Sequence, residues 1–380
     1  MKIVSIEPTP SPHSMKINVD EHLPDGQTRN YKLNDDLSSA PDYIKELFAI
    51  KGVKGLYHVI DFIALERNPR DAWEEILPKV RQVLGSSEDS PEKETTGSPT
   101  PDKHFGEIKV FIQMFRGIPV QVKLQDGDDE QRFGLPERFM EATMKASETS
   151  DNMLMERKWA EQSPRYGEAK DIGQDVVEEL SASYDQERLN ELVKRALSDD
   201  KTEANQSTVT RKKVTLDMLD NPSWKERYAA LDRMDLSVDD LLVLDKALDD
   251  EKASIRRLAT AYLGMIEQPE VLPLLYKALK DKAVNVRRTA GDCLSDLGFT
   301  DAIPDMTATL SDKSRIVRWR AAMFLYEIGD KTAIPALKQA MDDPEFEVRM
   351  QVKMALARIE GGEKAQGSIW HQMTQATKQK

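Results

Sequence analysis

The sequence predicts a multidomain chain, in which an α+β N-terminal domain and a hairpin–helix middle segment precede an all-α solenoid. Residues 248–360 repeat one pattern, with units that begin at Leu248, Leu279, Leu310 and Met341, 31 residues apart. A fixed period of this size is typical of a stacked repeat array. Short runs of alternating apolar and polar residues come earlier and are typical of strands. A stretch without apolar residues, 86–103, separates two such regions.

Each repeat begins with a helix whose apolar positions follow in steps of four, four and three residues. These steps put the positions on one stripe of a helix, and a small residue in the second register lets a neighbouring helix approach. The four registers are Ile255, Val286, Val317 and Val348; Ala259, Ala290, Ala321 and Val352; Leu263, Leu294, Leu325 and Leu356; and Ile266, Leu297, Ile328 and Ile359.

A break and a shorter second helix complete each repeat. Gly298 and Gly329 follow the first helix of the inner repeats, where glycine is the usual residue just past a helix end. Pro273, Pro304 and Pro335 follow the first apolar residue of the second helix, where the missing N–H costs nothing. Such a hairpin buries its apolar face only by stacking on its neighbours.

Two polar registers share the same period and form what we call the ladder. An Asp at the start of the first helix can cap that helix, and an Arg six residues later can reach the Asp of an adjacent repeat as a charge-assisted pair. Because both follow the repeat frame, we favour a structural role over a binding role. The ladder residues are Asp250, Asp281, Asp312 and Asp343 with Arg256, Arg287, Arg318 and Arg349.

This array resembles HEAT repeats, in particular short HEAT-like units of about this period, within the armadillo-like class of solenoids. In that family an Asp/Arg ladder is an internal structural feature, which the resemblance implies here too. An imperfect first unit starts at Leu219, 29 residues before Leu248. An atypical terminal repeat is expected, because one of its faces meets water. We place the solenoid at residues 215–362 and a tail at 363–380.

Residues 1–85 predict a separate α+β module, with the order strand, helix, two strands, helix. The prolines in the segment 7–17 favour an extended, solvated path after the first strand. Residues 40–53 predict a helix that ends at Gly52, and the next two strands meet in a tight turn between His58 and Asp61. Asp71 followed by Glu74 resembles a capping box before the last helix.

This module resembles the N-terminal domain of Nfu/NifU-type scaffold proteins across nearly its whole length. The resemblance is carried by Ile6–Ile17, Leu47–Arg67 and Trp73–Val80, and in the first of these by Glu7, Pro8, Thr9, Pro10, Pro12, Ser14 and Lys16. In that family the domain accompanies a cluster-binding domain with a Cys-x-x-Cys pair. This sequence has one cysteine, Cys293, whereas iron–sulfur clusters are held by several thiolates.

Residues 86–104 predict a flexible linker, because they are polar, charged and rich in proline. The middle region, 105–214, begins with alternating residues on both sides of Arg116–Gly117, which predicts a β-hairpin. A helix with Pro136 near its start and a helical stretch over 176–197 follow. The region therefore predicts a hairpin–helix segment that connects the module to the solenoid.

Composition limits the classes of function. The net charge of −13 repels a polyanion, and four of the solenoid arginines already belong to the ladder, so nucleic acid is an unfavoured partner. No apolar run reaches membrane-spanning length, and the N-terminus lacks the apolar core of a signal peptide. A single cysteine fits a reducing cytoplasm. We expect a cytoplasmic protein without a membrane partner.

The residue types of common catalytic and metal centres do not gather along the sequence. No two of the histidines stand at ligand spacing, so we expect surface histidines, no metal and no cofactor. Cys293 shares its repeat register with apolar residues, so we expect a packed thiol rather than a nucleophile. A lyase-type enzyme, like bilin lyases with related repeats, has no supporting residue constellation. The histidines are His13, His22, His58, His104 and His371.

The order of Nfu-type module, middle segment and HEAT-like array resembles the conserved virulence factor C family over the full length. The resemblance implies a cytosolic protein that affects virulence-associated expression in some Gram-positive bacteria, and it implies no reaction. We expect a non-enzymatic scaffold or adaptor that binds unidentified proteins, possible iron–sulfur biogenesis proteins among them. The alternative is an accessory protein in iron–sulfur cluster assembly or iron handling, with a cluster held between chains.

Overall fold

The computed structural model describes residues 1–9, 11–24, 27–85, 107–127, 129–150, 152–198 and 211–362. The chain forms two compact units. Unit 1 combines Met1–Phe105 with Thr300–Lys380, and unit 2 is Gly106–Phe299. We describe each by itself. The predicted linker 86–104 and tail 363–380 lie outside the described residues, and the predicted domain boundaries stay predictions.

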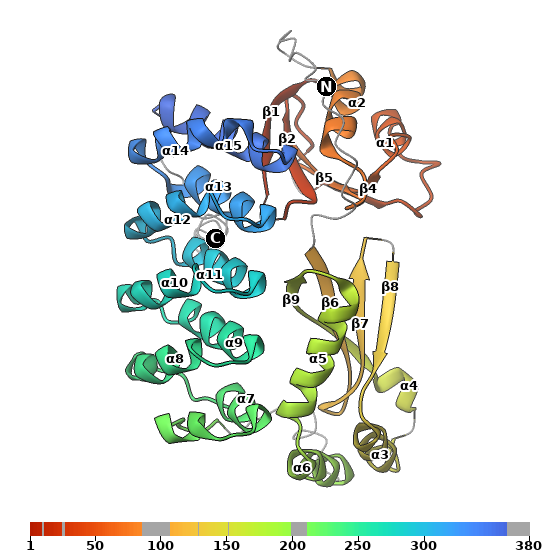
Figure 1. Ribbon diagram of the computed structural model, residues 1–380. Coiled ribbons are helices and arrows are strands. Elements are labelled where there is room, and N and C mark those ends of the chain that lie inside the picture. Colours follow the sequence, from red (N-terminus) through yellow and green to blue (C-terminus); the bar gives the residue numbers. More distant parts are fainter. Residues whose placement is uncertain are drawn as a thin grey trace. The chain divides into compact units, whose positions relative to one another are not determined.

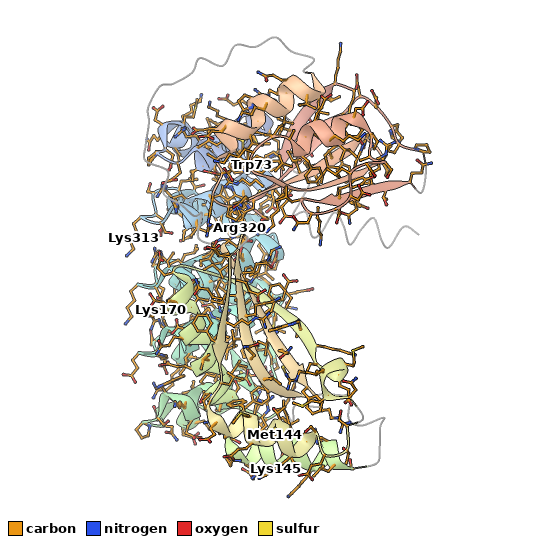
Figure 2. The ribbon with its side chains drawn as sticks, turned by 90° about the vertical axis from the view of Figure 1, so that its right-hand side faces the viewer. Trp73, Met144, Lys145, Lys170, Lys313 and Arg320 are labelled. Atoms are coloured by element: carbon orange, nitrogen blue, oxygen red, sulfur yellow. The ribbon has the colours of Figure 1, made fainter. Side chains whose placement is uncertain are left out.

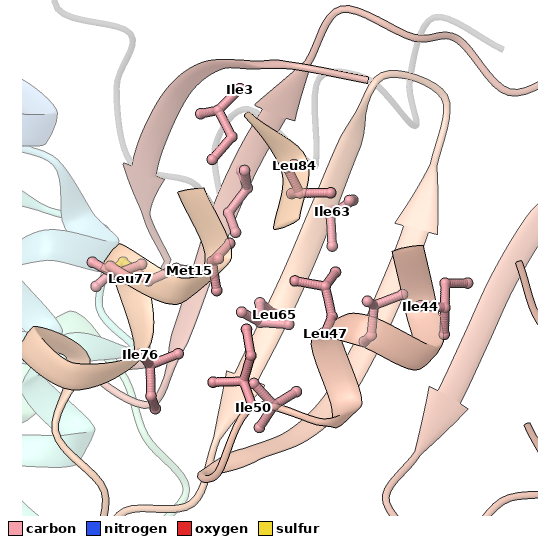
Figure 3. Packing of buried hydrophobic residues seen from close by; sticks show 14 of the residues in the cluster. Ile3, Met15, Ile44, Leu47, Ile50, Ile63, Leu65, Ile76, Leu77 and Leu84 are labelled. Carbon is pink, nitrogen blue, oxygen red and sulfur yellow. The ribbon is translucent and has the colours of Figure 1, made fainter. Parts of the chain in front are cut away.

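The N-terminal module of unit 1 (residues 1–85) is an antiparallel sheet with strand order β1-β2-β5-β4-β3. Two helices cover one face, and their apolar side chains meet those of the strands (Figure 3). Ile17 pairs with Ile63 at the centre of the sheet, and both are fully buried. The elements are β1 Ile3–Pro8, β2 Ser14–Val19, β3 Thr28–Lys32, α1 Asp42–Phe48, β4 Val53–Val59, β5 Phe62–Arg67 and α2 Trp73–Leu84.

Three local predictions for this module were wrong. Residues 7–17 do not follow a solvated path, because β1 runs to Pro8 and β2 starts at Ser14. α1 ends at Phe48, and Gly52 instead provides the positive φ of +97° in the turn before β4. α2 begins after Ala72, so Asp71 is no cap and pairs with Lys51 at 3.5 Å.

Unit 1 also contains the last repeats of the array (Figure 1). The long first helix α13 pairs with the short second helix α14, α12 is a second helix and α15 a first helix, and the predicted apolar registers are buried. Pro304 and Pro335 lie in the first turn of their helices, as predicted. The helices are α12 Ile303–Thr309, α13 Arg315–Ile328, α14 Ile334–Gln339 and α15 Phe346–Glu360, with 3-10 turns at Thr300–Ala302, Lys331–Ala333 and Ala340–Asp342.

Unit 2 begins with an antiparallel sheet of strand order β8-β7-β6-β9. The predicted hairpin is β6 and β7, and Arg116 in its turn has a φ of +46°. β8 and β9 were not predicted, and the helical stretch 176–197 is two helices rather than one. The elements are β6 Glu107–Phe115, β7 Ile118–Asp126, β8 Asp129–Gly134, α3 Glu137–Ala146, α4 Met153–Glu156, β9 Lys158–Tyr166, α5 Ala169–Ser183 and α6 Gln186–Leu197.

Helices lie against this sheet in two groups. α5 packs on the residues of β6 and β7 that include Val110 and Val122, whereas α3 and α6 share a second apolar cluster around Phe139 and Leu189. The outer side of α3 carries Met144 and Lys145 at the protein surface (Figure 2). The middle segment therefore has its own core.

The first repeats of the array complete unit 2. Gly298 ends α11 with a φ of +67°, the left-handed conformation that glycine favours. The helices are α7 Trp224–Asp232, α8 Leu241–Leu248, α9 Ala253–Gly264, α10 Leu272–Ala278 and α11 Val284–Leu297, with 3-10 turns at Leu216–Asp220, Val238–Asp240 and Pro269–Val271. The observed fold is thus α+β followed by a helical repeat array, as the sequence predicts.

Candidate interaction surfaces

The ladder joins one repeat to the next through two-pronged ion pairs. In unit 2, Arg256 donates from Nε and Nη2 to Asp281 Oδ2 and Oδ1 at 2.7 and 3.0 Å. Both side chains are largely buried. The same contacts join Arg227 to Asp250 in unit 2 and Arg318 to Asp343 in unit 1. Such paired hydrogen bonds fix the orientation as well as the distance between the arginine's helix and the turn that carries the aspartate.

The same guanidinium groups also hold the turn that precedes their own helix. Arg256 Nη1 donates to the carbonyls of Asp250 and Glu251 at 2.8 and 3.0 Å. Arg287 contacts the carbonyl of Asp281 in the same way, at 2.9 Å. One arginine thus links the loop of its own repeat with a carboxylate of the next repeat.

The ladder aspartates do not cap their helices in the predicted manner. Asp281 Oδ1 accepts from the N–H of Ala283 at 2.7 Å, and Ala283 is itself the N-cap residue of α11. Asp250 and Asp343 accept from the residues two positions on, at 2.8 and 2.9 Å. The carboxylate therefore shapes the turn before the helix, since a capping side chain would accept from an N–H inside the first turn.

The last ladder arginine has a different partner, in the N-terminal module. Arg349 Nη1 donates to the carbonyl of Asp343 at 2.7 Å, as in the earlier repeats. Its Nη2 donates to Glu74 Oε1 of α2 at 2.7 Å. Glu74 therefore stands where a following repeat would supply an aspartate.

A second ion pair lies beside this one and is more deeply buried. Arg67, at the end of β5, contacts Glu347 of α15 at 2.8 Å, and their side chains are 2% and 11% exposed. Burial lowers the pKa of the Arg67 guanidinium, and Glu347 opposes that shift. The guanidinium also lies 5.4 Å from the centre of the Trp73 ring. Phe346 and Met350 of α15 pack against the apolar core of the module.

The residues that carry the Nfu-type resemblance form the support behind this contact. Trp73 Nε1 donates to the carbonyl of Pro12 at 3.0 Å, and the Arg67 N–H donates to the carbonyl of His13 at 2.9 Å. Thr9 Oγ1 donates to the carbonyls of Ser11 and Ser14, both at 3.0 Å. Thr9 therefore holds the segment before β2, and Trp73, at the start of α2, binds that segment at Pro12.

The charged residues of this motif lie on the sheet. Lys16 Nζ pairs with Glu7 Oε2 at 2.9 Å, and Asn18 donates to Glu7 Oε1 at 2.6 Å. Pro10 lies outside the described residues. The structure brings Glu7 and Lys16 together across β1 and β2, and it places Thr9 and Pro12 between those strands and Ser14 at the start of β2.

In unit 2 the first helices of the array use one face to hold the middle segment. Glu179 of α5 lies between Arg165 of β9 and Arg257 of α9, at 2.8 and 3.3 Å. Burial disfavours ionisation of Glu179, but Arg257 and Arg165 outweigh it and lower the pKa of the carboxyl. Burial, and then Glu179, raise the pKa of Tyr228 on α7 well above its usual range. Lys252 adds a pair with Glu178 at 2.8 Å.

This face was not predicted as a contact surface. Arg257 and Arg288 each directly follow a ladder arginine, and Arg288 lies 4.7 Å from the centre of the Tyr166 ring. The same register holds Met350 in the last repeat, where it contacts the N-terminal module. The available signal was a basic residue that repeats beside the ladder. Its partner Glu179 does not repeat, so sequence periodicity could not find the contact.

The prediction of surface histidines was wrong for His13 and His58, which are buried. His58 Nδ1 contacts Tyr43 Oη at 2.6 Å, and Arg29 Nη1 donates to the same hydroxyl at 2.9 Å. Burial, then Arg29, lower the pKa of His58. His22 is exposed, while His104 and His371 lie outside the described residues. The two buried histidines, His13 and His58, are therefore packed inside the N-terminal module.

Cys293 is buried in α11, and its Sγ lies 3.4 Å from the Thr260 carbonyl. Among the residues that the structure describes, no three His, Cys, Asp or Glu side chains are placed to hold a metal ion. In the same part of the chain, no helix is both long enough and apolar enough to cross a membrane.

Family models match all three parts of the chain. Residues 4–90 match "Scaffold protein Nfu/NifU N terminal", and residues 113–193 match "Virulence factor". Residues 255–281 match "PBS lyase HEAT-like repeat", and residues 277–357 match "HEAT repeats". The first model covers the β1–β5 sheet, the second most of the sheet and helices of the middle segment, and the last two the array.

Relatives match the chain from end to end. Conserved virulence factor C of Staphylococcus haemolyticus is 45% identical over 383 residues, which cover 100% of both chains. The chain belongs to the conserved virulence factor C family. The Staphylococcus aureus (strain MRSA252) protein of that name is 46% identical over 99% of this chain and 100% of its own. The uncharacterized protein YpgR of Bacillus subtilis is 59% identical over 100% and 99%.

Two solved structures resemble single parts of this family member. Protein SAV1430 from Staphylococcus aureus is 38% identical over 22% of this chain and 98% of its own, with a TM-score of 0.21. The complex of CpcE and CpcF of phycocyanin lyase from Nostoc sp. is 26% identical over 32% of this chain and 53% of that chain, with a TM-score of 0.29.

Proposed function

We propose that this conserved virulence factor C protein is a non-enzymatic cytoplasmic scaffold, whose array positions its other modules and binds a partner protein. The observation that carries the proposal is the use of the first helices. In unit 2 they hold the middle segment through the Arg165–Glu179–Arg257 contact, and in unit 1 α15 holds the N-terminal module through Arg67–Glu347. HEAT-type arrays suit this role, because stacked repeats offer extended surfaces.

The second helices of unit 2 supply the surface for a partner in this proposal. Leu242 of α8 is 73% exposed, and Pro273 is exposed at the same position of α10. A large apolar side chain with so much exposure is a candidate contact for a partner. The first helices are less suited, since in both units some of their residues contact the chain's own modules.

Partner capture in a Bacillus subtilis strain without YpgR tests the proposal. The tagged chain is cross-linked in cells, and its partners are compared with those of Leu242→Glu on α8. We expect one set of proteins to be lost from this variant and kept by Met140→Glu, whose side chain is also exposed but lies on α3. A set of partners that is unchanged by substitutions on α8 and α10 would contradict the proposed surface.

A second candidate function is an accessory role in iron–sulfur cluster assembly or iron handling, favoured by the Nfu/NifU match of residues 4–90. In this role the chain would bring an assembly protein to its target rather than ligate a cluster, because its one thiol, Cys293, is buried beside Thr260. This candidate would be favoured if the chain captured proteins that bind iron–sulfur clusters through Cys-x-x-Cys pairs. Removal of the N-terminal module should then abolish the capture.

A further inference from the structure

The end of the array in unit 1 differs from its inner repeats at the positions that meet the N-terminal module. Phe346 takes the register of Ala253, Val284 and Arg315, and Met350 takes the register of Arg257, Arg288 and Trp319. Both pack against the core of the module. A terminal repeat must cover the apolar face that lacks a following repeat, and here the module covers it.

Charge makes this contact selective. The module presents Arg67 and Glu74, and α15 presents Glu347 and Arg349, so that each positive group meets a negative one at 2.7–2.8 Å. Any orientation that exchanged the two pairs would bring like charges together, at a cost in binding energy. We call these four residues the clasp.

The clasp also copies the contact between repeats. Arg349 binds the Asp343 carbonyl and Glu74 as Arg256 binds the Asp250 carbonyl and Asp281. An Nfu-type module that carries Arg67 and Glu74 therefore binds the end of the array as a following repeat would. The recognition uses side chains on the surface of the module and needs no covalent connection close to the contact.

We propose that the end of the last repeat is a docking site for Nfu-type modules. The chain's own module occupies this site in cis, and the module of a second copy can occupy it in trans. Residues 86–106 join the module to β6 and can span at most roughly 70 Å, and exchange of an identical element between two copies is a low-cost route to a dimer. This deepens the proposed scaffold function by naming a partner class.

Two full-length variants test the proposal. The first carries Arg67→Glu with Glu74→Arg, which spoils its module and keeps its docking site. The second carries Glu347→Arg with Arg349→Glu, which spoils the docking site and keeps the module. Each variant alone faces like charges across the contact, so we expect a monomer. An equimolar mixture restores both charge patterns in trans, so light scattering after gel filtration should give the mass of two chains.

Two controls make the result specific. All four substitutions in one chain restore opposite charges in cis, so that protein should be a monomer and should not pair with either double variant. Lys338→Glu with Glu360→Lys reverses an exposed ion pair between α14 and α15 and should leave the wild-type mass unchanged. Thermal unfolding of every variant checks that it is folded before mixing.

A mixture of folded variants that stays monomeric at tens of micromolar would overturn the proposal, as would a dimer formed by either variant alone. If a charge reversal prevents folding, Arg67→Gln replaces the first variant and Glu347→Gln replaces the second. In their mixture the wild-type module of one chain can bind the wild-type docking site of the other, so pairing is again expected. The readout involves only two copies of this chain, so its failure would leave the partner-capture test of the scaffold untouched.

Discussion

Arg256 illustrates how much of this fold depends on a single side chain. Its guanidinium contacts two carbonyls of its own turn and both carboxylate oxygens of Asp281, and little of it is exposed. A pair like this adds little net stability when intact, because both charges lost their hydration. Its removal is costly for the same reason.

We therefore predict that Arg256→Ala lowers the free energy of unfolding by about 3–5 kcal/mol, since it leaves Asp281 buried without its partner. Chemical denaturation with a helical signal measures the change. Lys277→Ala is the matched control, because Lys277 pairs with Asp245 at a more exposed site and should cost under about 1 kcal/mol. Equal effects of the two substitutions would show that the ladder pair is no more important than a surface pair.

His58 predicts a pH dependence. Burial and Arg29 lower its pKa from the usual 6.5 in the folded chain. Below that value the unfolded chain binds a proton that the folded chain does not, so stability is complete above about pH 6.5 and falls as the pH drops toward the folded pKa. Melting temperatures between pH 7.5 and 5.0 should decline more for wild type than for His58→Gln. Parallel curves would rule His58 out as the cause.

Sequence alone located the ladder because each register recurs four times, so a single chance residue could not produce it. It could not locate Glu179, which occurs once and reaches Arg165 and Arg257 only after the middle segment folds. The burial of His58 was missed for a similar reason. The strand with His58 and the helix with Tyr43 were both predicted, but the packing that brings Tyr43 to His58 was not.

At the scale of elements, α9 and α11 approach closely at Gly264. A Cβ on this residue would lie 2.4 Å from Cys293 Sγ and 2.8 Å from Cys293 Cβ. We expect Gly264→Ala to push the two helices apart and to destabilise the chain by about 1–3 kcal/mol. Gly134→Ala in β8, where a Cβ meets open space, should be nearly neutral in the same denaturation experiment. A neutral Gly264→Ala would mean that the helices can separate freely.

The strands show which elements a sequence reveals. β6 and β7 were visible because apolar residues alternate along both. β3, β8 and β9 are edge strands with few apolar residues, and edge strands need no continuous apolar face. β2 alternates clearly, with Met15 and Ile17 buried, but the prolines before it suggested an extended segment. Proline is tolerated beside a strand, where its missing N–H is not needed.

At the scale of the whole molecule, unit 1 unites the first and last parts of the sequence. Two expectations meet here, that residues 1–85 form a separate module and that residues 215–362 form one solenoid. Neither anticipates that Phe346 and Met350 add to the core of the module. The repeat period does not relate residues of the N-terminal module to residues of the last repeat. Only the structure could therefore reveal this contact.

The absence of clustered ligands among the described residues carries the last prediction. We expect protein purified without oxygen, and then incubated with iron and sulfide, to stay colourless after desalting, because one buried thiol cannot hold a cluster. Iron, sulfide and visible absorption are measured together. A stable absorption band with equal iron and sulfide, lost in Cys293→Ser, would contradict this and favour a cluster shared between chains.

The ladder also restricts how an array of this kind can change its length. Arg256 and Arg318 each meet an aspartate 25 residues further along the chain, and Arg227 meets one 23 residues further along. Loss of the 31 residues that begin at Leu248 would present Arg227 with Asp281 in place of Asp250, in the same helical frame. Loss of 30 residues would turn every later helix by about 100° and set apolar side chains against water. Genes for such arrays should therefore gain and lose whole repeats, because only a whole repeat keeps both the ladder and the apolar registers aligned.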